Sequence, residues 1–138
     1  MLQPFNDLGY LPVGIHLCTI EEIDVKFGNG SEERESEIAE LFSFVDAARA
    51  AGVRRLLVDG SFVTSKSAPN DVDIVILPDA NHPRNIAKLE DDELLWPFLQ
   101  IFVAADESDF DAWATTQFGT DRQGRTKNVV EVMLWPNT

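Results

Sequence analysis

Two aspartates separated by one residue are the most informative polar pair in the sequence. Asp71 and Asp73 stand at the start of residues 71–77, whose alternating apolar pattern predicts a strand. Side chains alternate between the two faces of a strand, so both carboxylates should project from one face, about 7 Å apart. Nearby acids in a half-buried place raise the pKa of one of them or attract a cation, and carboxylate oxygens suit Mg²⁺ or Mn²⁺. We therefore predict a divalent metal site at this pair, against the plainer interpretation of a solvated strand edge or turn cap.

A glycine and a serine precede the aspartates and suit a bound phosphate. Gly60 and Ser61 follow residues 54–59, a short apolar run that predicts another strand. A glycine at a strand end lets backbone N–H groups approach a phosphate, and the serine hydroxyl adds a donor. Lys66, between the two predicted strands, can neutralise phosphate charge, although a lysine in a loop is usually only solvated. Together with the carboxylates, these residues predict a site for a metal-bound nucleoside triphosphate.

These motifs resemble the DNA polymerase beta-like nucleotidyltransferase superfamily, in which a Gly-Ser or Gly-Gly turn is followed by Asp-x-Asp on a strand. Gly60-Ser61 and Asp71-Val72-Asp73 match that pattern, and Pro69-Asn70 is similar to the lead-in of minimal nucleotidyltransferases. The resemblance implies an α+β nucleotidyltransferase fold and binding of a nucleoside triphosphate with Mg²⁺. It also implies transfer of a nucleotidyl group to a hydroxyl of a protein or small molecule. Residues 11–16, 58–66 and 70–74 look, in addition, like a family of small uncharacterised bacterial proteins on this fold.

Active members of the superfamily usually supply a third carboxylate from a further strand, and two positions compete for that role. If residues 98–104 form this strand, Gln100 stands where the acid is expected, and a neutral amide cannot act as a base. If residues 129–135 form it, Glu131 completes a catalytic set with Asp71 and Asp73. Chain order favours Gln100, so the alternative is a catalytically inactive interaction module. Minimal members of the superfamily often occur in toxin–antitoxin pairs, which makes an antitoxin-like partner protein an expectation from the resemblance.

The net charge narrows the range of partners. The chain carries 24 acidic and 11 basic residues, a net charge of −13, and a negative surface repels phosphate backbones. This charge argues against direct nucleic-acid binding, although an acidic mimic of nucleic acid remains a weaker hypothesis. The acidity suits metal cations, a basic protein partner, a homo-oligomer or simply solubility. Arg122, Arg125 and Lys127 are clustered, which is typical of a polar turn or, alternatively, of a phosphate clamp.

The elements that must position these residues follow from length and periodicity. With 138 residues, 44% hydrophobic and 25% charged, the chain should fold as one globular domain. Residues 1–30 should be largely irregular, with at most a short helix at 19–27, and a capped helix should run from Ser31 to Gly52. Strands at 54–59 and 71–77 should follow that helix, and a helix at 86–96, a strand at 98–104, a helix that begins after Asp106 or Ser108 and a strand at 129–135 should come next. This order predicts an α+β fold, a mixed sheet with helices packed mainly on one face.

The location of the protein can also be predicted. The apolar runs are shorter than the roughly 18 residues that a membrane span needs, and the first ten residues lack a basic region ahead of an apolar stretch. The single cysteine, Cys18, permits no internal disulfide, which agrees with a reducing compartment. We expect a cytoplasmic protein with no membrane partner.

Overall fold

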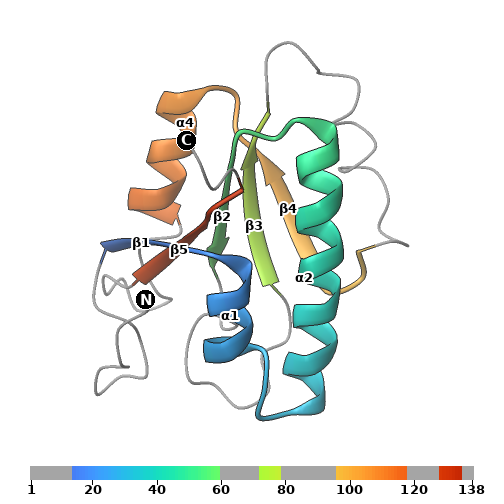
Figure 1. The fold of residues 1–138 in the computed structure, drawn as a ribbon. Helices are drawn as coiled ribbons and strands as arrows, with labels where there is room; N and C mark the ends of the chain where they lie inside the picture. Colours follow the sequence, from blue (N-terminus) through green and yellow to red (C-terminus); the bar gives the residue numbers. More distant parts are fainter. Residues whose placement is uncertain (1–13, 60–71, 79–95, 118–127, 135–138) are drawn as a thin grey trace.

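Five strands form one mixed sheet in the computed structural model, which describes residues 14–59, 72–78, 96–117 and 128–134. The strand order is β1-β5-β2-β3-β4 (Figure 1). Strand β2 runs antiparallel to both β5 and β3, whereas the β1–β5 and β3–β4 pairs are parallel. The strands are β1 (Gly14–Cys18), β2 (Arg55–Asp59), β3 (Val72–Leu77), β4 (Leu99–Val103) and β5 (Asn128–Val132). The mixed sheet confirms the predicted α+β class.

Two capped helices lie between β1 and β2. Helix α1 (Ile20–Phe27) begins at Thr19, whose hydroxyl accepts a hydrogen bond from the N–H of Glu22 while the Glu22 carboxylate accepts one from Thr19. Helix α2 (Glu32–Ala51) begins after Ser31, as predicted. It ends at Gly52, which has a φ of 81°, a left-handed conformation that glycine adopts without strain. Residues at the two ends of α2 therefore determine where this helix begins and ends.

The last helix among the described residues, α4, precedes β5. Helix α4 (Glu107–Ala112) is capped by Asp106, whose carboxylate accepts a hydrogen bond from the N–H of Asp109. The chain continues without a break into a π-helical segment, Trp113–Gln117. The Trp113 ring packs against Phe102 of β4, with ring centroids 4.9 Å apart. Of the two residues predicted to cap this helix, Asp106 and Ser108, the structure shows Asp106 as the N-cap.

Each face of the sheet has its own apolar cluster. Helices α1 and α2 cover one face, and α4 with the π-helical segment packs on the other (Figure 1). Most of the described helical residues, those of α1 and α2, thus pack on one face, which agrees with the prediction, while the shorter α4 and the π-helical segment pack on the other. Alternating strand residues divide between the two clusters, so Leu56 and Val58 lie under α2 while Leu57 lies under α4.

One prediction about the start of the chain is wrong for its described part. Within the segment 1–30, which was expected to be largely irregular, residues 14–18 form the unpredicted strand β1, whereas α1 at residues 20–27 agrees with the short helix expected at 19–27. Strand β1 pairs with β5, from the far end of the chain, and such a long-range pairing leaves little trace in local sequence. The helix expected at 86–96 and the basic cluster at 122–127 lie outside the described residues.

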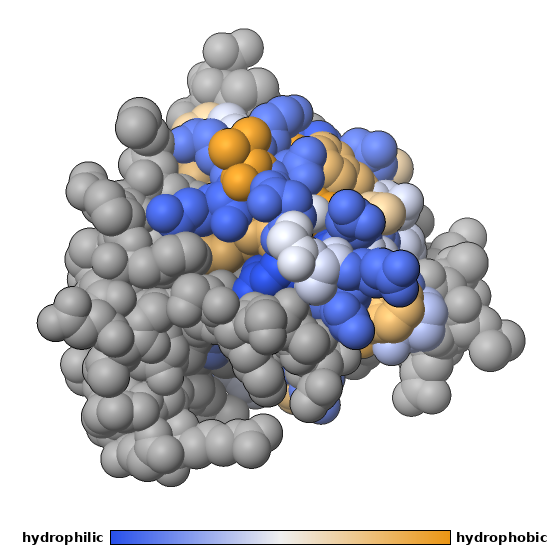
Figure 2. Space-filling view, turned by 90° about the horizontal axis from the view of Figure 1, so that it is seen from below, coloured by the Kyte–Doolittle hydropathy of each residue, from blue (hydrophilic) through white to orange (hydrophobic). Residues whose placement is uncertain are grey.

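One face of the described part of the molecule is mainly polar. Figure 2 shows the end of the molecule seen from below, where hydrophobic atoms occur in small separate groups among hydrophilic ones. Within the described ranges, no helix is both long enough and apolar enough to cross a bilayer.

Candidate functional site

The structure describes part of the predicted nucleotide site. Asp73 is the second residue of β3. Gly60, Ser61, Lys66 and Asp71 lie outside the described residues. The geometry of the candidate site is therefore built from Asp73 and the residues on the neighbouring strands.

Asp59 lies directly opposite Asp73. It is the last residue of β2, and the antiparallel β2–β3 register pairs these two residues. Directly opposed residues share a face of the sheet, with Cβ atoms about 4.5–5.5 Å apart. Asp59 is only 4% exposed, and Asp73 is partly buried. Two carboxylates, one of them buried, thus stand side by side where β2 ends and β3 begins.

Gln100 lies on the other side of Asp73. The parallel β3–β4 register pairs Asp73 with Gln100, whose side chain is exposed. We call Asp59, Asp73 and Gln100 the polar row. Two residues further along each strand, Leu57, Val75 and Phe102 belong to the apolar cluster under α4. The polar row therefore lies on the α4 face, at the end of that cluster.

The polar row has the donors that a hard cation requires. Carboxylate and amide oxygens are the ligands that Mg²⁺ and similar hard cations prefer in proteins. Among the described residues, no group of three or more His, Cys, Asp or Glu side chains forms a metal site. The described part of the sheet thus places two carboxylates and one amide in register, side chains of the types that bind Mg²⁺ but too few to complete its coordination.

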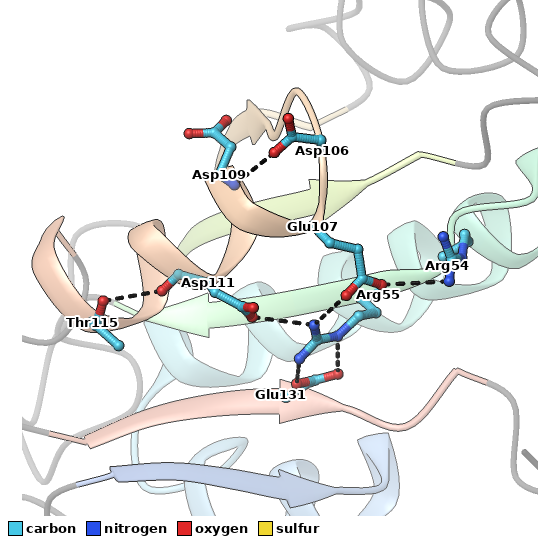
Figure 3. Close-up of polar contacts among 8 residues, drawn as sticks. All are labelled: Arg54, Arg55, Asp106, Glu107, Asp109, Asp111, Thr115 and Glu131. Carbon is cyan, nitrogen blue, oxygen red and sulfur yellow. Dashed lines mark hydrogen bonds and ion pairs between the residues drawn. The ribbon is translucent and has the colours of Figure 1, made fainter.

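Glu131 lies outside the polar row. It is on β5 opposite Leu57, which is two residues from Asp59 along β2. Arg55 donates two hydrogen bonds to its carboxylate, of 2.8 Å to Oε1 and 3.0 Å to Oε2 (Figure 3). Glu131 is therefore engaged in a bidentate ion pair, and the structure brings Gln100, not Glu131, beside Asp73.

One family model covers most of the chain. Residues 3–133 match the model of a family described as Family of unknown function (DUF6932). The chain belongs to the DUF6932 family. No curated protein and no solved structure matches it.

Arg55 also links α4 of the DUF6932 domain to the sheet. Its Nη1 lies 3.3 Å from a carboxylate oxygen of Asp111 and 3.6 Å from one of Glu107 (Figure 3). The guanidinium carbon lies 4.4 Å from the centroid of the Phe110 ring. The hydrogen bonds to Glu131 raise the pKa of Arg55 above its usual value, so the side chain stays charged. These contacts fasten α4 over the same face that carries the polar row.

Two important residues of this DUF6932 domain were not singled out by sequence reasoning. Asp59 ends an otherwise apolar strand just before Gly60, and an acid in that position was the available signal. Arg55 opens the same strand, but its partners come from β5 and α4, so no local pattern indicated the cluster. Cys18 is buried in the core, and burial raises the pKa of its thiol to about 12, which makes it a poor nucleophile.

Proposed function

We propose that this protein binds a magnesium-bound nucleoside triphosphate at the end of β2 and β3 and transfers its nucleotidyl group to a hydroxyl of a protein or small molecule. The observation that carries the proposal is the cross-strand pair of Asp59 and Asp73 on one face of the sheet. In the sequence, Gly60 and Ser61 directly follow Asp59, and Asp71 precedes Asp73 by two residues. In the sequence, the Gly-Ser pair and Asp71 are thus immediate or near neighbours of the two facing carboxylates.

The division of roles follows from the chemistry of the side chains. Asp71 and Asp73 would hold Mg²⁺ or Mn²⁺, and Asp59 would supply a further carboxylate to the same site. When bound, the metal neutralises charge on the triphosphate and on the departing pyrophosphate. Gly60 and Ser61 would hold the terminal phosphates through backbone N–H groups and the hydroxyl, with Lys66 adding positive charge.

In the transfer step, the chain orients the α-phosphorus in line with the acceptor hydroxyl. A bond forms between the acceptor oxygen and the α-phosphorus, the bond to the leaving phosphate oxygen breaks, and pyrophosphate departs. The hydroxyl proton passes to a carboxylate acting as general base. Asp59 suits this role because it faces Asp73 directly, whereas Glu131, the acid proposed from the sequence, is bonded to Arg55.

A second candidate function is favoured by Gln100. Its position beside Asp73 gives the polar row a neutral amide that can bind a metal weakly but cannot accept a proton. With Gln100 in place of a third acid, the same site would bind a nucleotide without transferring its nucleotidyl group. The protein would then be an interaction module, an antitoxin-like partner whose net charge of −13 suits a basic protein.

Calorimetry with each of ATP, GTP, CTP and UTP, with and without Mg²⁺, tests the proposal. We expect metal-dependent binding to the native chain and its loss in the Asp59→Asn and Asp73→Asn variants. Asp46→Asn is the matched control, because Asp46 is an exposed residue of α2, a helix that packs on the opposite face of the sheet. Circular dichroism checks that each variant folds.

The outcomes separate the two candidates. Equal affinity in all variants, or no binding of any triphosphate by the folded native chain, would overturn the nucleotide site. Binding that depends on Asp59 and Asp73, without release of pyrophosphate in the presence of hydroxyl acceptors, would favour the interaction module. Pyrophosphate release that depends on the same residues would support the transferase.

A further inference from the structure

We draw no further inference here: the strongest candidate, the apolar surface that Ile15 and Leu17 expose on the edge strand β1, carries nothing because no feature of the described structure shows what covers it.

Discussion

Asp59 and Asp73 face each other across the β2–β3 pair, and Asp59 is 4% exposed. Opposed like charges repel each other across a strand pair, and a divalent cation bound between two carboxylates would reduce that repulsion. The proposed metal site therefore leads to a prediction about the stability of the fold.

Mg²⁺ is expected to stabilise the native chain more than either aspartate variant. Because a ligand that binds only the folded state adds RT ln(1 + [L]/Kd), Mg²⁺ at about 100 times its Kd should add about 2.7 kcal/mol. Thermal unfolding in Mg²⁺ and in chelator measures this gain for the native chain, Asp59→Asn, Asp73→Asn and the Asp46→Asn control. An equal gain in all four proteins would mean that the cation binds elsewhere.

Replacing Gln100 by glutamate is expected to tighten metal binding. The new carboxylate would stand beside Asp73, in register, and give the polar row a third acid. We expect the Kd for Mg²⁺ to fall about tenfold, which corresponds to about 1.4 kcal/mol. Calorimetric titration with Mg²⁺ measures the change, and Gln100→Ala is the control that removes the amide without adding charge. An unchanged or weaker affinity in Gln100→Glu would show that this position lies outside the metal site.

Replacing Arg55 by methionine is expected to destabilise the fold by about 2 kcal/mol, since hydrogen bonds to charged groups contribute about 1.5–3 kcal/mol. The change would leave the Glu131 side chain, 15% exposed, without its bidentate partner and would loosen α4. Urea unfolding provides the measurement.

Arg54→Met is the matched control for that experiment. Arg54 is 57% exposed and pairs with Glu107 at 3.4 Å, and exposed pairs of this kind contribute about 0–1 kcal/mol. A similar loss of stability in the two variants would mean that the Arg55 cluster is no stronger than an ordinary surface ion pair.

The buried thiol of Cys18 is expected to make the fold less stable in alkaline solution. Burial raises the pKa of its thiol from 9.0 to about 12, so the folded chain keeps the proton where the unfolded chain releases it. The free energy of unfolding therefore keeps the full contribution of the protonated thiol below pH 9, and this contribution should decline as the pH rises toward 12. Urea unfolding at a series of pH values measures this decline, which should be smaller in Cys18→Ala.

A thiol reagent gives an independent check of the same residue. The cysteine should stay unreactive at neutral pH in the folded chain and react once urea unfolds it, since Cys18 is 1% exposed. Rapid reaction of the folded protein would contradict the burial on which the alkaline prediction depends.

Local signals in the sequence determined most of the helices and strands. Ser31 and Gly52 mark the ends of α2 because capping depends on the residues at and next to the helix ends. Short apolar runs bounded by glycine or proline predicted β2, β3 and β4 within one or two residues. The same short-range information revealed Gly60-Ser61 and the Asp71–Asp73 pair as candidates for one site.

Tertiary structure decided which strands are neighbours, and this choice defines the site. Alternation along a strand tells which residues share a face, but the residue opposite depends on strand order and register. Only the β2–β3 register brings Asp59 to Asp73, and only the position of β4 next to β3 brings Gln100 there instead of Glu131. The pairing of Arg55 with Glu131 has the same origin, because packing of distant strands joins side chains that no local pattern connects.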